Sequence, residues 1–221
     1  NFYYFYENLI NKNLMILLPI ILFLLMHIWR PLFLGIYHDD WNIFFDMHKT
    51  TLSFSVWADS HNFLERPRPF HDITLYLISK FGRNQPENLV VMSSLIVGLS
   101  SISIYFFLKK LTKLLSLKIY TQSIAVSFWI IIPWGLGYSL WLSGSSTLIS
   151  MIFFNLSLIL IIDYFSEKSV FRLIVSCIFL LLSFLTYQAF YFFYIPIFLL
   201  IYFLKTKNTF KDRKLIVAFV M

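Results

Sequence analysis

Long hydrophobic runs separated by short polar segments dominate the chain. The first run covers residues 14–37 and is apolar apart from His27 and Arg30, and the second, 88–108, contains no charged residue. A helix crosses the hydrocarbon core of a bilayer with about 20 apolar residues. Each of these two runs therefore predicts one membrane-spanning helix.

A third run extends from residue 119 to 162 without a single charged side chain. It is too long for one spanning helix, and it contains a cluster of small residues, Ser143, Gly144 and Ser145. Such clusters favour turns. We therefore expect the run to break within residues 142–146 and to form two spans.

The run 173–204 is interpreted from the charges around it. A single helix of this length would rise about 48 Å, against a hydrocarbon core of roughly 30 Å. The basic segments 109–118 and 205–214 lie on the same side of the membrane only if this run crosses twice. Because Lys and Arg concentrate in cytoplasmic loops, we predict two short spans that turn at residues 186–189, and a seventh span after residue 214.

Composition supports a membrane protein and excludes a soluble enzyme. Of the 221 residues, 59% are hydrophobic, 20% are aromatic and only 13% are charged. We expect an all-α polytopic membrane protein with about six transmembrane helices and the start of a seventh, its N-terminus cytoplasmic. We expect residues 1–221 to be the N-terminal part of a single transmembrane domain, in a bacterial plasma (inner) membrane.

The excess of basic residues gives the chain a net charge of +7. The positive-inside rule accounts for it, with a contribution from anionic membrane lipid, so we expect no nucleic-acid partner. The single Cys177 lies in an apolar run and is expected to be an inert thiol within the membrane.

The predicted extracytoplasmic loop 38–87 holds most of the polar chemistry. It contains seven of the eleven acidic residues and four of the five histidines. Apolar residues recur at helical spacing after Pro69 and again from Trp41. We expect two amphipathic helices on the outer membrane surface within this loop.

Two adjacent carboxylates, Asp39 and Asp40, follow the first span directly, between His38 and Trp41. Mutual repulsion and partial desolvation favour a raised pKa at one of them, which suits a general base that deprotonates a hydroxyl. The alternative is that one Asp caps the helix that begins at Trp41. The pair would also hold a divalent cation, Mg²⁺ or Mn²⁺, together with a substrate phosphate. The histidine spacing does not favour zinc.

Arg66 and Arg68 are separated by prolines in a stiff extended segment. A guanidinium pair is suited to a phosphate or diphosphate group. Binding of ordinary anionic lipid, or ion pairing with neighbouring carboxylates, remains open for both. Arg30 lies within the first span, where it either snorkels to the headgroups or contacts a lipid phosphate.

These elements together resemble the GT-C superfamily of membrane glycosyltransferases. The closer likeness is to the bacterial O-antigen glucosyltransferases of the Gtr type II family. The matching motifs are Tyr37-His38-Asp39-Asp40-Trp41, Arg66-Pro67-Arg68-Pro69 and Thr186-Tyr187-Gln188-Ala189. The resemblance implies inverting transfer of a sugar, glucose or another hexose, from a polyprenyl-phosphate donor to a cell-surface glycan such as O-antigen, the lipopolysaccharide polysaccharide.

The resemblance also implies residue roles. Asp39 or Asp40 would be the general base, and the other would assist or hold a metal. Arg66 or Arg68 would stabilise the departing lipid phosphate. Trp41, His38, Tyr187, Gln188 and Arg30 would complete the substrate site, although Tyr187 and Gln188 would serve equally well as helix-end packing at the interface.

Two other functions remain open. A polysaccharide polymerase or ligase would use similar chemistry, but such proteins usually carry their largest outer loop later in the chain. A flippase or transporter of lipid-linked sugars would place ionisable residues near the middle of its spans. The predicted spans here are almost free of charge, which favours chemistry at the outer rim.

Overall fold

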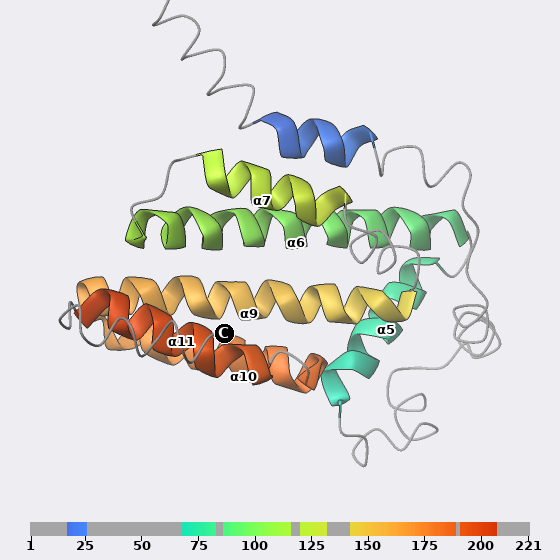
Figure 1. Ribbon diagram of the computed structural model, residues 1–221. Coiled ribbons are helices and arrows are strands. Elements are labelled where there is room, and N and C mark those ends of the chain that lie inside the picture. The colour runs from blue at the N-terminus through green and yellow to red at the C-terminus, as the bar shows by residue number, and fades with distance from the viewer. Residues whose placement is uncertain are drawn as a thin grey trace, which may run out of the picture.

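The computed structural model describes residues 17–25, 68–82, 86–115, 120–131, 142–188 and 191–206, and within these ranges the secondary structure is helical without a strand. Figure 1 shows the helices packed side by side as a bundle, except α5 (Pro69–Gly82), which crosses one end. The bundle contains α6 (Pro86–Leu114), α7 (Tyr120–Ile131), α9 (Leu142–Glu167), α10 (Val170–Thr186), α11 (Tyr191–Thr206) and the helix 17–25. The all-helical fold class is therefore confirmed for the described residues.

The two longest helices, α6 and α9, run parallel to each other. Ser93 faces Ser145 with 3.3 Å between their hydroxyl oxygens, and the Asn155 side-chain amide donates to Ser103 at 3.0 Å. Both pairs are separated by 52 residues in the sequence, which is the pattern of parallel helices in register. The remaining helices pack around this pair.

Helices α9 and α10 form an antiparallel hairpin through Lys168 and Ser169, and Lys168 has a positive φ of 55°. The two helices meet along a line of buried serines. The hydroxyls of Ser150 and Ser183 are 3.0 Å apart, and those of Ser157 and Ser176 are also 3.0 Å apart. Small hydroxyl residues allow helix backbones to approach closely, as is common at interfaces between membrane helices.

The size and the hydrogen bond of Ser157 are expected to contribute separately to stability. Ser157→Ala keeps the close approach and loses the hydroxyl contact with Ser176, so we expect a loss of about 0.6 kcal/mol of unfolding free energy for that contact. Ser157→Leu forces the helices apart and is expected to cost about 1–3 kcal/mol. Unfolding of the purified protein in detergent, followed by circular dichroism, measures both. Equal losses for the two variants would contradict a size-limited interface.

Helix α11 returns along the bundle toward the end of α9, where the Lys205 ammonium donates to the Ser166 hydroxyl. The chain reverses between Thr186 and Tyr191, within the segment where the sequence predicts a turn. Figure 1 shows that α6, α9 and α11 run in one direction, whereas α7, α10 and the helix 17–25 run in the other.

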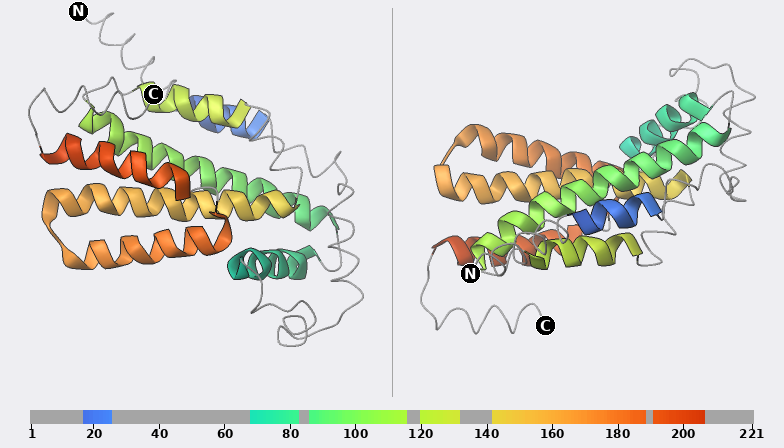
Figure 2. Two further views of the ribbon diagram at one scale, coloured as in Figure 1. Left: turned by 60° about the horizontal axis from the view of Figure 1, so that its bottom comes forward. Right: turned by 90° about the horizontal axis from the view of Figure 1, so that it is seen from above.

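Hydrophobic contacts hold α5 across the end of the bundle, as Figure 2 shows from two further directions. Leu75 and Ile78 of α5 are buried in one cluster with Leu89 and Ile96 of α6 and Leu148 of α9. Proline at the first helical position and the apolar spacing after it explain why α5 forms here. The predicted helix after Pro69 is confirmed.

The face that α5 buries differs from the one that its apolar spacing emphasises. Leu77 and Phe81 are 56% and 65% exposed, whereas Asp72 and Thr74 are buried. The helix therefore has two apolar faces, one against the bundle and one pointing away from it. The outward face is available to a lipid surface.

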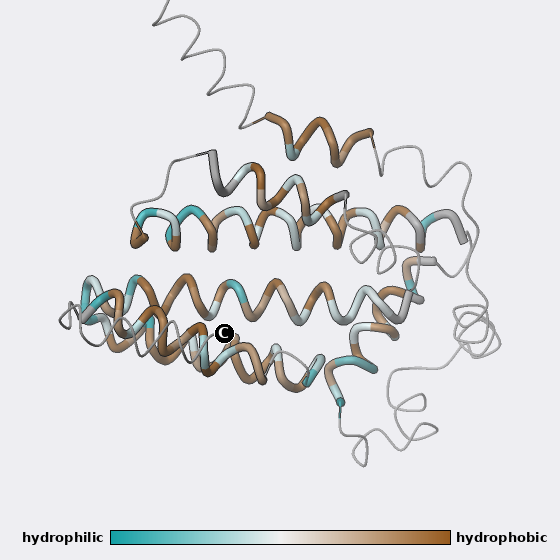
Figure 3. Tube along the Cα trace, in the orientation of Figure 1, coloured by the Kyte–Doolittle hydropathy of each residue, from teal (hydrophilic) through white to brown (hydrophobic). Residues whose placement is uncertain are grey.

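In the part of the chain that the structure describes, two helices are long and apolar enough to cross a membrane, Val91–Leu114 and Gly144–Glu167. The segments Val170–Thr186 and Phe192–Lys205 are also apolar but shorter. Figure 3 shows hydrophobic positions along most of α9 and α10. Large apolar side chains on outward faces are exposed, among them Leu95, Leu99, Ile102 and Phe106 of α6 and Phe171, Ile174, Ile178 and Leu181 of α10. Cys177 is exposed on the same helix.

The structure corrects two element boundaries. The run 119–162 does form two helices, α7 and α9, but the break comes before the expected residues 142–146, because α9 already begins at Leu142 and the small residues of its first turns are buried against neighbouring elements. Helix α6 also continues to Leu114, beyond the predicted end at residue 108. The lysines at its end remain helical because Lys110 pairs with Asp163 of the parallel helix.

Candidate functional site

Three of the predicted site residues lie within the described part of the chain: Arg68, Tyr187 and Gln188. The structure brings Arg68 and Tyr187 into contact at the end of the bundle that α5 crosses. The other predicted site residues fall outside the described residues and remain predictions: Arg30, His38, Asp39, Asp40, Trp41 and Arg66.

The start of α5 determines the position of Arg68. Its backbone carbonyl accepts a hydrogen bond from the Asp72 amide at 3.4 Å, so Arg68 is the residue that precedes the first turn, and Pro69 follows at the first helical position. The guanidinium carbon lies 5.0 Å from the centre of the Tyr187 ring, a cation–π contact. Among the described residues, no carboxylate forms an ion pair with Arg68.

The end of α10 determines the position of Tyr187. This residue leaves the helix with extended backbone angles, φ −152° and ψ 114°, while its amide donates to the Ser183 carbonyl at 2.8 Å. The Ser150 hydroxyl of α9 lies 3.4 Å from the Tyr187 carbonyl and 2.8 Å from the Ser183 carbonyl. The corner is therefore tied to α9. Gln188 follows and is exposed.

His71 adds a second polar contact beside Arg68. Its Nδ1 lies 2.6 Å from the hydroxyl oxygen of Ser146, which belongs to the second turn of α9 and is fully buried. Residues three apart lie on one face of a helix. The first turn of α5 thus directs Arg68 and His71 toward the corner of α10 and the beginning of α9. We call Arg68, His71, Ser146 and Tyr187 the rim cluster.

The rim cluster has chemistry suited to anion binding. A guanidinium presents several N–H donors in a plane, and the contact between His71 and the buried Ser146 hydroxyl fixes the start of α5, and so the position of Arg68, against α9. The first turn of α9 contains no acidic residue, so the positive end of its helix dipole is not offset there. Asp72 is 4% exposed and faces inward from α5. Among the described residues, no three His, Cys, Asp or Glu side chains are placed to hold a metal ion.

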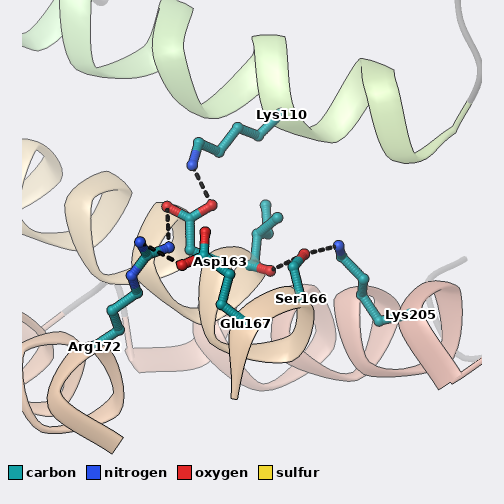
Figure 4. Close-up of polar contacts among 7 residues, drawn as sticks. Lys110, Asp163, Ser166, Glu167, Arg172 and Lys205 are labelled. Atoms are coloured by element: carbon teal, nitrogen blue, oxygen red, sulfur yellow. Dashed lines mark hydrogen bonds and ion pairs between the residues drawn. The ribbon is translucent and has the colours of Figure 1, made fainter. Parts of the chain in front are cut away.

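The opposite end of the bundle carries a different polar cluster, drawn in Figure 4. Asp163 of α9 accepts a hydrogen bond from Lys110 of α6 and lies 3.7 Å from a guanidinium nitrogen of Arg172 on α10. Arg172 also contacts Glu167 at 2.6 Å. The Asp163 carboxylate thus links α6, α9 and α10. The two basic and two acidic side chains of this cluster pair with one another. This cluster is structural in character.

Sequence reasoning missed the part of the rim cluster that His71 and Ser146 supply. In the sequence His71 stands out only as one of the loop histidines, whose spacing does not favour zinc. The available signal was its position three residues after Arg68, which places both on one face once a helix begins at Pro69. No local signal in the sequence pairs His71 with Ser146, 75 residues later.

No protein-family model, no curated protein and no solved structure matches this chain.

Proposed function

We propose that this chain belongs to a multi-pass membrane glycosyltransferase that moves a hexose from a polyprenyl-phosphate donor to a cell-surface glycan on the outer face of the membrane. The observation that carries the proposal is the contact between Arg68 and Tyr187. They come from two motifs that are more than a hundred residues apart and that the resemblance assigns to one substrate site. Two unrelated surface residues would not be expected to form this contact.

The roles follow from the chemistry of the transfer. Charge on the lipid phosphate grows as the bond to the sugar breaks, so donors already aimed at that position lower the barrier. Arg68 is the proposed donor, and Tyr187 holds its guanidinium in place. The beginning of α9, whose first turn contains no acidic residue, supplies further positive potential nearby. Asp39 or Asp40 is the proposed base for the acceptor hydroxyl, with Arg66 beside the same phosphate.

A six-span arrangement with the rim cluster outside is part of the proposal. Two features support it: successive helices alternate in direction, and apolar side chains are exposed along α6 and α10. The lysines of α6 and α11 gather at the end opposite to the rim cluster. Lysine-rich ends are typical of the cytoplasmic side, and this supports the proposed position of the rim cluster on the outside.

The proposal is tested by mass spectrometry of surface glycans. Cells that make the full-length protein are compared with otherwise identical cells in which its gene is deleted. We expect one hexose-sized mass to be present in the first and absent in the second, and to return when the gene is restored. Identical glycans in the two strains would overturn the proposal, and uptake or flipping of lipid-linked sugar would then be measured instead.

A further inference from the structure

An apolar cavity lies on the side of the bundle, away from the rim cluster. The helix 17–25, α6 and α7 enclose a volume of about 400 Å³, and both views of Figure 2 show these helices close together. The described residues that line it include no charged side chain, and the hydroxyl of Ser101 is bonded to the Val97 carbonyl of its own helix at 2.8 Å. Water gains little in such a space, whereas a hydrocarbon chain fits its chemistry.

The cavity depends on a glycine and opens toward the exposed apolar surface of α6. A Cβ atom at position 98 would come within 3.1 Å of the Phe23 ring, so Gly98 allows that ring to pack against α6 at one edge of the cavity. On the outer edge, Ile102 and Phe106 are 53% and 50% exposed. A chain entering from the surrounding lipid therefore meets no polar barrier there.

Two lysines continue the same face of α6. Lys109 and Lys113 follow Phe106 at helical spacing and are exposed, and among the described residues neither forms an ion pair. Their neighbour Lys110 points to the other side, where it is paired with Asp163. The distance along the helix from Gly98 to Lys109 is about 16 Å, roughly half the thickness of the hydrocarbon core. This face of α6 thus matches one leaflet of a bilayer: its part from Gly98 to Phe106 is apolar like the acyl chains, and Lys109 and Lys113 lie at the depth of the headgroups.

We infer that this face of α6 binds an anionic phospholipid, with one acyl chain in the cavity and the headgroup phosphate on Lys109 and Lys113. The inference is independent of the proposed transfer reaction, because no residue of the rim cluster takes part. Charge complementarity selects an anionic lipid over a zwitterionic one. The bound lipid fills the space between α6, α7 and the helix 17–25.

The test uses the full-length protein in detergent, exchanged into mixed micelles with phosphatidylglycerol or phosphatidylcholine that carries a diazirine in one acyl chain. After illumination, mass spectrometry locates the crosslinked peptides. We expect phosphatidylglycerol to label peptides of α6, α7 or the helix 17–25 in preference to other segments. Ile102→Trp, which fills the cavity from its exposed edge, is expected to abolish this labelling. The matched control is Ile174→Trp on α10, where the parent side chain is 54% exposed, and it should retain the labelling.

The headgroup is tested with the double variant Lys109→Gln and Lys113→Gln. Its preference for phosphatidylglycerol over phosphatidylcholine should fall about thirtyfold, since two lysines near an anionic surface contribute roughly that factor. The control Lys168→Gln, an exposed lysine at the same end, should keep the preference. Uniform labelling of all exposed helices, or equal loss in Ile102→Trp and Ile174→Trp, would overturn the inference, as would an unchanged preference in the double lysine variant.

Discussion

Replacing Arg68 with glutamine is expected to lower the rate of sugar transfer by about a hundredfold to a thousandfold, the usual effect of removing one preplaced donor to a developing oxyanion. The loss should appear in kcat more than in KM, because the phosphate charge is larger in the transition state than in the bound donor. Arg68→Lys should recover part of the rate, since an ammonium keeps the charge but not the paired donors. The measurement is transfer from a labelled lipid-linked sugar in membranes with matched protein levels.

Variants of Tyr187 test how Arg68 is held. Tyr187→Phe keeps the ring face under the guanidinium and should leave the rate near that of the parent, whereas Tyr187→Leu releases Arg68 and should cost about tenfold. The chain offers a matched control in Lys80, whose ammonium lies 5.0 Å from the Tyr76 ring on the same helix α5. Lys80→Gln should transfer normally. A normal rate for Arg68→Gln would remove Arg68 from the proposed mechanism.

The same assay tests the acidic pair. Asp39→Asn and Asp40→Asn each remove one carboxylate and nearly preserve its shape, so the variant that loses its product identifies the base. If both variants retain the parental rate, the pair serves as a helix cap and the base lies elsewhere. Protein levels in the membrane must match in all strains.

Replacing Asp163 with alanine is expected to cost about 2–3 kcal/mol of unfolding free energy. The side chains of Asp163 and Lys110 are only 25% and 34% exposed, and removal of the carboxylate leaves Lys110 and Arg172 without their shared counter-charge. Breaking a well-buried pair costs about 3–5 kcal/mol, and the partial exposure here reduces that figure. Unfolding in detergent measures the change.

Glu167 supplies the control for Asp163. It contacts Arg172 at 2.6 Å but is 56% exposed, so Glu167→Gln should cost less than about 1 kcal/mol. The double variant Asp163→Leu with Lys110→Met exchanges the pair for apolar side chains and should regain most of the lost stability. Equal losses for Asp163→Ala and Glu167→Gln would show that Asp163 does not link the three helices.

Charge and periodicity predicted the parts of the fold that depend on long runs. The turn between α10 and α11 was found because two basic segments had to lie on one side, and α5 because apolar residues recur after Pro69. The Ser143-Gly144-Ser145 cluster led to a break predicted too late in the chain, and the reason is physical. Small residues suit both a turn and a close helix contact, and only the partners, such as Ser93 opposite Ser145, decide between these outcomes.

The motifs predicted two residues of the candidate site but not their contact or the two further residues of the rim cluster. Arg68 and Tyr187 were named from motifs, and their contact is a feature of tertiary structure that no local pattern contains. His71 and Ser146 meet because α5 turns across the bundle, and this direction depends on the burial of Leu75 and Ile78. A sequence period identifies the buried face of a helix but not the direction in which the helix leaves its neighbours.

The wide spacing of the rim cluster along the chain has a consequence for biosynthesis. His71 and Ser146 are separated by 75 residues, and Tyr187 follows later still. At about 5–20 residues per second, ribosomes need roughly 4–15 s to extend the chain from His71 to Ser146. During that interval α5 is already made while its partners in α9 and α10 are absent. A nascent or prematurely terminated chain that ends before the corner of α10 therefore cannot assemble the cluster, so unfinished copies would lack the site of the proposed reaction.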